Sequence, residues 1–529
     1  MKLKLSYSLL AKTFLIFCTI YFSNLPAKAQ NPIGVFDNQL DIGHPKIKGH
    51  TEYNPENQSY TLKGAGYNIW FNRDEFQYAY KKIKGDFLLT ANFEFLNPDV
   101  EGSNHRKIGW MIRESLEDNS AEINACAHID GLTVLQWREL KGAYMRDPED
   151  EIFAPKKGGE IIQLERSGKT LIMRIAHRGE PLQLVGIHEM KDLKDEVLAG
   201  IYICSHDSNQ VAEAKVWNLR IDKPLADIPF NASPSAKPNP EPGILACRLE
   251  TMDMESGIRK VIHESKGRFE APNWMPGGKK LLFNEGGELY TISTEGEEVQ
   301  KLNTGKVNHL NNDHVLSKDG NWLGISSHRS GLNGGGSTVY VLPLQGGEPR
   351  LITEQTPSYL HGWNPNGKEL AIVAQRNGFK IYNLYRVSIK DGKEIPLTEN
   401  KIGHVDGPEY SPDGKYIYYN ANASGTMQIW RMDRDGSHPI QLTFDELNNW
   451  FPHISPDGKK MVFISFPPSI DPNSHPSYKR VTLRWMPING GSPQVIAYLY
   501  GGQGTMNVNS WSPDSKKIAF VSNSGQPLE

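Results

Sequence analysis

Short stretches in which apolar and polar residues alternate run along most of this chain, and turn-forming residues separate them. In the first half the apolar positions lack the 3.6-residue period of an amphipathic helix. Such segments predict β-strands with one buried face, and their close spacing is typical of a two-sheet β-sandwich. The nine segments are Asp86–Phe95, Lys107–Arg113, Ile123–Ile129, Leu132–Arg138, Ile161–Arg166, Thr170–Ala176, Leu182–Ile187, Leu198–Ser205 and Glu213–Ile221.

The second half repeats itself around a four-residue turn whose full form is Ser-Pro-Asp-Gly. Proline presets φ at the second position, aspartate caps the turn, and glycine takes the left-handed conformation before the next strand. Successive turns begin 42, 47, 47, 44 and 57 residues apart, a period typical of the four-stranded blades of a β-propeller. The turns are Met275–Gly278, Ser317–Gly320, Asn364–Gly367, Ser411–Gly414, Ser455–Gly458 and Ser512–Ser515.

A second repeated unit, strand–turn–strand, follows each of the first five turns. After the last turn only the strand Lys517–Ser522 remains, whereas a sixth copy of the unit, Ile244–Ile262, stands before the first turn. Because closing a ring removes exposed sheet edges, we expect this early copy to pair beside the last strand, which predicts a six-bladed propeller. The five regular copies are Leu289–Leu302, Val339–Ile352, Leu384–Leu397, Ile429–Leu442 and Leu483–Ile496.

A proline-rich stretch separates the two halves. Residues 223–243 contain six prolines among small polar residues, the composition of a semi-rigid linker without a core of its own. The predicted organisation is therefore all-β, with a β-sandwich at residues 30–222, the linker, and the propeller at residues 244–529.

The first 29 residues have the pattern of an export signal. Lys2, Lys4 and Lys12 form a basic region before a mostly apolar stretch at Phe14–Phe22, and Ala27-Lys28-Ala29 forms an A-x-A cleavage site. We expect cleavage after Ala29 and a periplasmic or secreted protein. No later stretch approaches the ~18 apolar residues of a spanning helix, so no transmembrane segment is expected in the mature chain.

Charge argues against nucleic acid as a partner. The formal charge of the chain is −3, and it becomes −7 once the four lysines of the first 29 residues, which contain no acid, are removed. A mildly acidic protein repels phosphate backbones.

The cysteines leave two alternatives open. No C-x-x-C motif is present, which excludes a zinc knuckle or a thioredoxin-like motif. Cys126 and Cys204 lie in the same predicted domain and would be able to form a disulfide after export. Alternatively, they and Cys247 are buried thiols that pack as small apolar residues.

The repeats resemble a known family. The run Ser411-Pro-Asp-Gly-Lys-Tyr-Ile-Tyr-Tyr, followed by Ile429-Trp-Arg-Met-Asp-Arg-Asp-Gly and Gln441-Leu-Thr, is similar to the TolB-type propeller repeat, a relative of the WD repeat. The resemblance covers residues 244–529 and implies the propeller fold. TolB carries a small α/β domain before its propeller, where this chain is β-rich, so the cell-envelope transport role of TolB is not carried over.

The first half resembles the concanavalin-like, laminin-G-like jelly rolls of exported bacterial proteins. The segments that carry this resemblance occur in the order Gly85–Ala91, Ile108–Ser115, His128–Gly131, Leu164–Thr170 and Gly200–Asp207. It implies a jelly-roll domain that contacts carbohydrate or packs against a neighbouring domain.

Candidate chemistry lies at the innermost strands of the propeller, just before the turns. No G-x-S-x-G, H-E-x-x-H, P-loop or dinucleotide motif is present. If the ring forms, polar side chains from successive blades converge at one mouth of the channel, which predicts a ligand site there. The candidate ligand-binding residues are His314, His361, His404, Glu409, Asn449, Trp450 and His453.

Two interpretations of these residues remain open. Four of them, His314, His361, His404 and His453, would be able to hold a divalent metal, or one would serve as a base, with Trp450 stacking on a sugar. Alternatively, the histidines bind backbone groups around a water-filled channel.

Three hypotheses for function follow. The first is an exported module that binds a saccharide or cell-envelope component. The second is a metal-assisted lyase or hydrolase, since oligogalacturonate lyases are similar propellers with histidine-held metal, although the likeness here is a histidine-rich channel strand and no matched motif. The third is a scaffold for protein partners.

Two further features concern binding. Trp70, Trp110 and Trp137 would form a sugar platform if exposed, whereas tryptophans in a sandwich commonly belong to the core. The long last interval between turns contains an insertion, Phe466–Arg480, which we expect to be a lid, a contact loop or a solvated loop.

Overall fold

The computed structural model describes residues 33–98, 102–225, 245–296, 298–329, 336–378, 380–399 and 403–525. The predicted signal peptide and most of the predicted linker lie outside these residues. Within these ranges the regular secondary structure consists of β-strands, most of which lie in antiparallel sheets. None of the described residues forms a helix with the length and hydropathy needed to span a bilayer.

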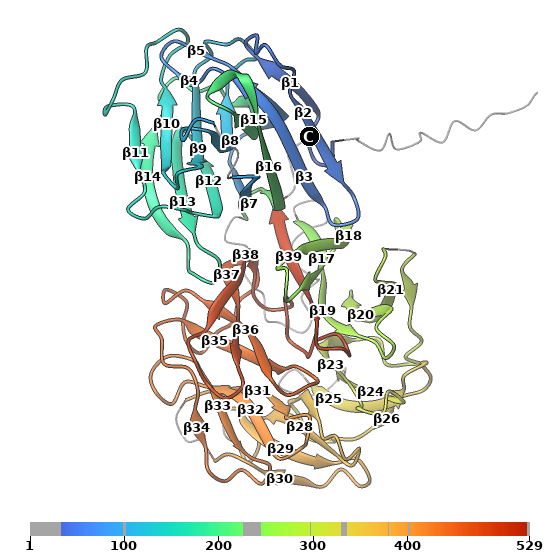
Figure 1. Ribbon diagram of the computed structural model, residues 1–529. Helices are drawn as coiled ribbons and strands as arrows, with labels where there is room; N and C mark the ends of the chain where they lie inside the picture. Colours follow the sequence, from blue (N-terminus) through green and yellow to red (C-terminus); the bar gives the residue numbers. More distant parts are fainter. Residues whose placement is uncertain are drawn as a thin grey trace, which may run out of the picture.

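Two seven-stranded sheets form the N-terminal part (Figure 1). In spatial order the first contains β1 (Asn38–Ile42), β6 (Phe76–Lys84), β15 (Glu196–Cys204), β8 (Lys107–Arg113), β9 (Glu122–His128), β10 (Thr133–Arg138) and β11 (Glu151–Phe153). The second contains β14 (Gln183–Glu189), β13 (Thr170–Ala176), β12 (Ile161–Ser167), β7 (Phe87–Leu96), β16 (Asp207–Asp222), β3 (Ser59–Gly66) and β2 (His50–Asn54). A small hairpin joins β4 (Ile69–Trp70) to β5 (Arg73–Asp74).

The core of this part lies between the two sheets. One cluster of buried residues includes Trp110 and Ile201 from the first sheet and Leu89 and Leu164 from the second. Trp110 has no exposed surface, and Trp137 is also buried. Only Trp70 is partly exposed, so the three tryptophans do not together form the exposed sugar platform considered from the sequence.

The three cysteines that the structure describes, Cys126, Cys204 and Cys247, are free and buried. Cys204 on β15 and Cys126 on β9 lie on either side of β8, and neighbouring strands are about 4.8 Å apart, so two strand spacings separate the thiols by more than a disulfide can span. Of the two alternatives considered from the sequence, the structure therefore shows the second, in which Cys126 and Cys204 are unpaired.

Four four-stranded sheets and one seven-stranded sheet form the C-terminal part. The first four-stranded sheet contains β19 (Phe269–Trp274), β20 (Lys280–Glu285), β21 (Glu288–Ser293) and β22 (Gln300–Lys301), and the second contains β23 (Leu310–Leu316), β24 (Trp322–His328), β25 (Ser337–Pro343) and β26 (Arg350–Leu351). The third contains β27 (Ser358–Trp363), β28 (Glu369–Ala374), β29 (Asn383–Ser388) and β30 (Glu394–Pro396), and the fourth contains β31 (Val405–Tyr410), β32 (Tyr416–Ala421), β33 (Gln428–Asp433) and β34 (Ile440–Gln441). The seven-stranded sheet runs β18 (Arg259–Ser265), β17 (Leu245–Asp253), β39 (Lys517–Gly525), β38 (Gln494–Gly501), β37 (Lys479–Pro487), β36 (Lys460–Phe466), β35 (Asn448–Ile454).

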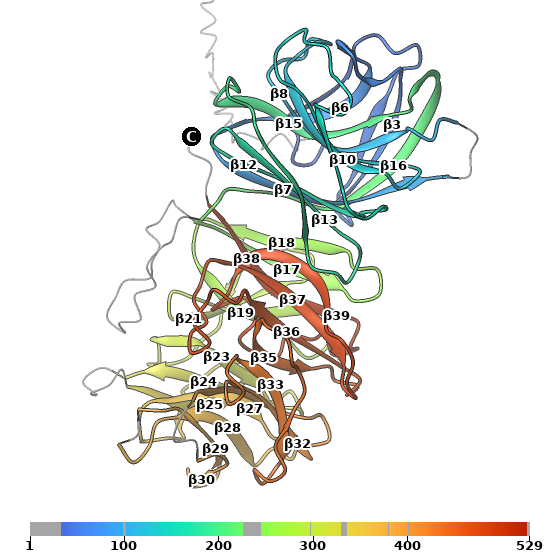
Figure 2. The same ribbon diagram turned by 90° about the vertical axis from the view of Figure 1, so that its left-hand side faces the viewer.

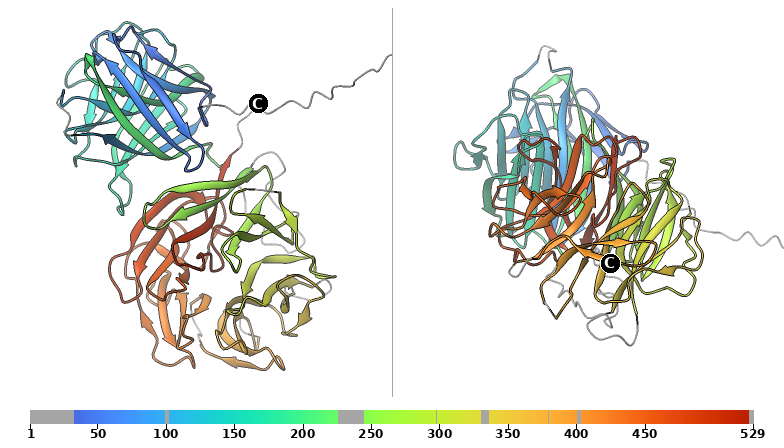
Figure 3. Two further views of the ribbon diagram at one scale, coloured as in Figure 1. Left: turned by 45° about the vertical axis from the view of Figure 1, so that its right-hand side comes forward. Right: turned by 90° about the horizontal axis from the view of Figure 1, so that it is seen from below.

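The two ends of this part meet in the seven-stranded sheet, as the repeat pattern predicts. β17 pairs with β39 over nine residues, from Leu245 opposite Gly525 to Asp253 opposite Lys517. β38 touches β39 through a single pair, Tyr500 opposite Asn523. The sheets are arranged around a ring, with the green β17 beside the red β39 (Figure 3).

The turns have the chemistry that their sequence predicts. At Ser455, the hydroxyl donates to Asp457 Oδ1 at 2.6 Å and accepts from the backbone N–H of Lys460 at 2.9 Å. The turns at Ser317, Ser411 and Ser512 repeat both bonds. Gly458 has φ of 69°, in the left-handed region that favours glycine.

Substitution of Gly458 tests the importance of this turn geometry. A Cβ at this position would meet nothing within 4 Å, so the cost of Gly458→Ala is conformational alone. We expect a loss of about 1 kcal/mol in the free energy of unfolding, measured in denaturant, and a smaller loss for Gly458→Asn, because asparagine tolerates the left-handed region better than alanine. Equal stability of the alanine variant and the unsubstituted protein would contradict this account.

The C-terminal part contacts the N-terminal part through β17, β18, β37, β38 and β39 (Figure 2). Arg220 on β16 donates to Glu250 on β17, and Arg480 on β37 binds Glu165 on β12 through two hydrogen bonds. Backbone bridges join Gly179 to Val495 and Lys223 to Gly525. The contacts combine a buried charge pair, a partly exposed charge pair and backbone bonds, so they favour one specific arrangement of the two parts.

Candidate functional site

An irregularity in the innermost strands directs polar side chains toward the ring axis. β19, β23, β27, β31 and β35 each shift register against the next strand a few residues before the turn. Ala271, Gly407 and Phe451, at corresponding positions of three of these strands, have φ near 55°. A bulge of this kind bends the strand and changes the direction of the following side chains.

Four side chains gather around the carboxylate of Asp406, and we call the five residues the Asp406 cluster: Asp313, His361, His404, Asp406 and His475. His361 Nε2 lies 3.2 Å from Asp406 Oδ1, and the Nε2 atoms of His404 and His475 lie 3.5 and 3.7 Å from Asp406 Oδ2. Asp313 Oδ1 lies 3.9 Å from His361 Nε2. Strands β23, β27 and β31 supply three members, His404 directly precedes β31, and His475 comes from the insertion.

Opposite charges stabilise the centre of the cluster. Burial alone would lower the pKa of His361, but the Asp313 and Asp406 carboxylates outweigh it and raise that pKa to about 9. Burial opposes ionisation of Asp406, yet hydrogen bonds from His361 and His404 hold its pKa well below its usual range. Near pH 7 the centre is therefore an imidazolium bound to a carboxylate.

In the outer members of the cluster, Asp313 and His475, the pKa shifts in the direction that disfavours the charged form. Burial raises the pKa of Asp313 to about 7, against the attraction of His361. Burial also lowers the pKa of His475. The side chains of His404 and His475 keep 18% and 25% of their surface exposed, so they form the accessible side of the cluster. A carboxyl group that titrates near neutral pH beside a fixed imidazolium is typical of functional sites.

Two of the predicted histidines lie apart from this cluster. His314 Nδ1 is 2.6 Å from Asn273 Oδ1, and burial lowers the pKa of His314 to about 3. His453 Nδ1 is 2.7 Å from Glu409 Oε2, and its Nε2 is 2.9 Å from the carbonyl of Met506. His453 thus contacts one backbone carbonyl and a carboxylate, whereas His314 contacts a side-chain amide.

The donor set does not fit the predicted metal. Among the residues that the structure describes, no group of three or more His, Cys, Asp or Glu side chains has an arrangement that would hold a metal ion. His361 and His404 share Asp406, whereas His314 and His453 have separate partners. The four histidines therefore do not converge as one ligand set, because His314, His361 and His453 each pair with a side chain on the innermost strand of a neighbouring sheet.

Trp450 and Asn449 are both buried and pack against other side chains of the protein. Trp450 has no exposed surface, and its ring packs 4.4 Å from that of His475 and 5.7 Å from that of His404. The structure therefore offers no open face of Trp450 to a sugar. Asn449 is buried and hydrogen-bonds Gln428 and Ser465.

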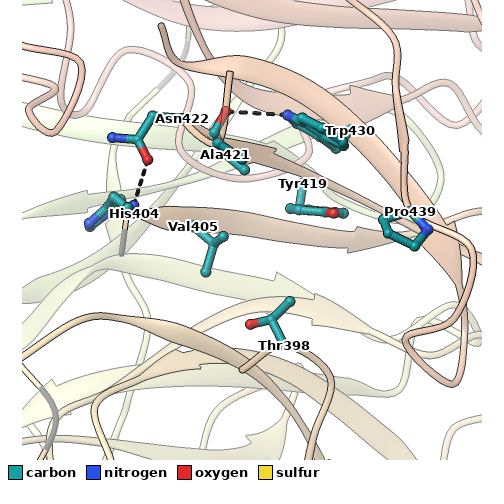
Figure 4. Close-up of a pocket in the computed structure, with 10 residues that line it drawn as sticks. Thr398, His404, Val405, Tyr419, Ala421, Asn422, Trp430 and Pro439 are labelled. Carbon is teal, nitrogen blue, oxygen red and sulfur yellow. Dashed lines mark hydrogen bonds between the residues drawn. The ribbon is translucent and has the colours of Figure 1, made fainter. Parts of the chain in front are cut away.

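A pocket of about 150 Å³ adjoins the cluster, and His404 belongs to both (Figure 4). We call it the His404 pocket. His404 and Asn422 lie at one side and Trp430 and Pro439 at the other, with the backbone N–H of His404 donating to Asn422 Oδ1 at 2.6 Å. Its lining is Thr398, Gly403, His404, Val405, Tyr419, Ala421, Asn422, Ala423, Trp430 and Pro439.

The insertion covers the cluster beside this pocket. Asn422 Nδ2 donates to Asn473 Oδ1 at 2.8 Å, and the carbonyl of Ile470 accepts from Asn448. His475 packs edge-on against Trp450 and Phe451. Of the roles considered from the sequence, the described contacts fit a covering loop. The sequence identifies the insertion by its length alone, so His475 was not predicted.

Comparisons with known proteins agree with the repeat architecture. Residues 356–477 match the family described as TolB beta propeller domain. An uncharacterised protein of Agrobacterium fabrum, Atu1656, is 40% identical over 280 residues, which are 53% of this chain and 93% of that protein. A solved structure described as a putative TolB from Agrobacterium tumefaciens is 39% identical, covers 54% of this chain and 100% of its own, and superposes with a TM-score of 0.50.

A more distant relative is matched over a short segment. The Tol-Pal system protein TolB of Anaeromyxobacter dehalogenans is 29% identical over 100 residues, 19% of this chain and 22% of that protein. This chain therefore spans about a fifth of that protein's length.

Proposed function

Because the C-terminal part of this chain belongs to the TolB-type β-propeller family, we propose that the protein is a binding module whose propeller takes a ligand at the mouth of its channel. The ligand we propose is a saccharide of the cell envelope, bound by one ring in the His404 pocket. The observation that carries this proposal is the convergence of Trp430, Asn422 and His404 on one pocket beside a charged cluster.

The size and lining of the pocket support this class of ligand. Small-molecule sites usually occupy about 300–1,000 Å³, so a pocket of about 150 Å³ suits one ring at the end of a longer molecule. Trp430 and Tyr419 supply flat apolar surface, while Asn422, Thr398 and His404 supply hydrogen-bonding groups. A sugar ring needs both kinds of surface.

The proposed architecture is a jelly-roll sandwich followed by a six-bladed propeller. Two facing sheets before residue 225 and a ring closed by β17 and β39 support it. The export pattern of residues 1–29 supports action in the periplasm or outside the cell.

Trp430→Ala tests the proposed pocket. Purified full-length protein is screened against an array of bacterial envelope glycans, and affinity for the best ligand is measured by titration calorimetry. We expect the variant to weaken binding at least about tenfold, since an aromatic face is lost at the centre of the contact.

Trp322→Ala is the matched control, because Trp322 is exposed on β24 and lies outside the pocket. It should leave affinity unchanged. Equal weakening by both variants, or absence of any bound glycan, would contradict the proposal. A protein that copurifies in place of a glycan would instead support the scaffold hypothesis.

A further inference from the structure

A second cavity lies where the ring closes. Its volume is about 390 Å³, and residues of β17, β18 and β39 form one wall while the first four-stranded sheet forms the other. We call it the closure cavity. It is distinct from the His404 pocket and shares no residue with it. Its lining is Thr251, Lys260, Trp274, Gly277, Gly278, Thr294, Glu295, Ser512, Pro513, Asp514 and Lys517.

The cavity coincides with a break in the repeat. In the four turns that begin with serine, the serine hydroxyl and an aspartate fill the turn with their mutual hydrogen bond. The first turn has Met275 and Gly277 at these two positions. A Cβ at Gly277 would meet nothing within 4 Å, so the missing side chain leaves open space.

The acids of this cavity have partners, whereas some of its hydrogen-bond donors have no acceptor. The Glu295 carboxylate is 3.2 Å from the Lys260 ammonium, and Asp514 accepts from the Ser512 hydroxyl and the Lys516 backbone. Trp274 is buried, with 7% of its surface exposed, and its indole N–H has no hydrogen-bond partner within the described ranges.

Lys517 supplies a positive charge at the same place. Its ammonium makes no ion pair within the part of the chain that the structure describes, although the nearby Asp253 carboxylate is influenced by its charge. Both acids of the lining have partners, Glu295 through Lys260 and Asp514 through two hydrogen bonds. The donors without one are the buried Trp274 indole N–H and the ammonium of Lys517, an exposed residue. Both donate hydrogen bonds, so an acceptor with negative charge would satisfy them.

We propose that the closure cavity binds the carboxylate of a small ligand, with Trp274 donating its indole N–H and Lys517 supplying the opposite charge. The volume lies within the usual range for small-molecule sites and accommodates more than the carboxylate itself. Two sources would present such a group, a uronic sugar residue or the C-terminus of a peptide.

Titration calorimetry on the full-length protein distinguishes the sources. The probes are D-glucuronate and N-acetyl-alanyl-alanine, each compared with its neutral amide. We expect saturable binding of at least one acid and binding of its amide at least about tenfold weaker, because a charge-assisted hydrogen bond is lost. Preference for one acid identifies the source.

Two conservative variants locate the binding. Trp274→Phe keeps the ring and removes the N–H, and Lys517→Met keeps the stem and removes the charge; each should weaken binding about tenfold. Trp363→Phe and Lys516→Met are the matched controls and should leave it unchanged. Trp363 occupies the same repeat position and has an unpartnered N–H among the described residues, but it lies outside the cavity.

Three results would overturn the proposal. The first is absence of saturable binding for both acids at millimolar concentration. The second is equal affinity for acid and amide. The third is equal weakening by Trp274→Phe and Trp363→Phe.

Discussion

Glu250→Ala is expected to lower the free energy of unfolding by about 3–5 kcal/mol, because it leaves two buried guanidinium groups without their shared carboxylate. Glu250 has no exposed surface and lies on β17, the strand that closes the ring. Its Oε2 accepts from Arg220 and its Oε1 accepts from Arg259 at 2.8 Å. Arg220 belongs to the N-terminal part, so one carboxylate links both parts at the closure.

Denaturant unfolding of the full-length protein measures this effect, and a nearby surface acid provides the control. Glu264 on β18 faces Arg248 at 3.6 Å with 55% of its side chain exposed, so Glu264→Ala should change stability by less than about 1 kcal/mol. If the two variants unfold at the same denaturant concentration, the buried link does not support the closure.

The same carboxylate makes stability sensitive to acid. Burial opposes its ionisation, yet Arg220 and Arg259 hold the pKa of Glu250 well below its usual range. The folded state therefore gains stability above the unfolded pKa of about 4.3 and loses it progressively as the pH falls below that value.

The ring could be predicted because its information is local and repeated. Each turn encodes its own hydrogen bonds, as Ser455 and Asp457 demonstrate. The pairing of β17 with β39 followed from counting strand units, since one unit lay unused at the start and one strand lay unpaired at the end.

The strands before residue 86 were not predicted, and for β3 there is a physical reason. β3 contains Gly64 and Gly66, residues that ordinarily weaken a strand. A Cβ at Gly64 would come within 2.9 Å of Gln77 and Ile203. Gly64 is therefore required by close packing against β6 and β15, which only the three-dimensional arrangement reveals.

The candidate site was predicted in outline and not in its membership. Repeat position alone made His314 and His361 equally good candidates for the site. In the structure the strand bulges pair His314 with Asn273 and direct His361 to Asp406. His475 lies in an insertion that interrupts the period, so no repeat position could identify it. The Asp406 cluster depends on contacts between blades that the spacing of one chain does not encode.

The centre of the cluster should make the protein less stable as the pH rises from about 6.5 to 9. The pKa of His361 is about 9 in the folded protein and about 6.5 when unfolded, so its stabilising contribution is complete below pH 6.5 and is lost as the pH passes 9. The difference corresponds to about 3 kcal/mol. The pKa of Asp313 is raised to about 7, so this residue adds a further loss of stability as the pH rises from about 4 to 7, on the acid side of this window.

Denaturant unfolding at a series of pH values measures this loss, and His361→Gln should remove the part above pH 7, because glutamine keeps a hydrogen bond to Asp406 without a charge that titrates. His438→Gln is the matched control, since His438 is an exposed histidine beside Asp433 on the outer surface and should leave the profile unchanged. Asp313→Asn removes one of the two carboxylates that hold the imidazolium, so the alkaline loss should begin at a lower pH. A profile for His361→Gln that parallels the unsubstituted protein up to pH 9 would mean that the buried imidazole is neutral, and the cluster would then lack the fixed positive charge that distinguishes it from an ordinary hydrogen-bonded core.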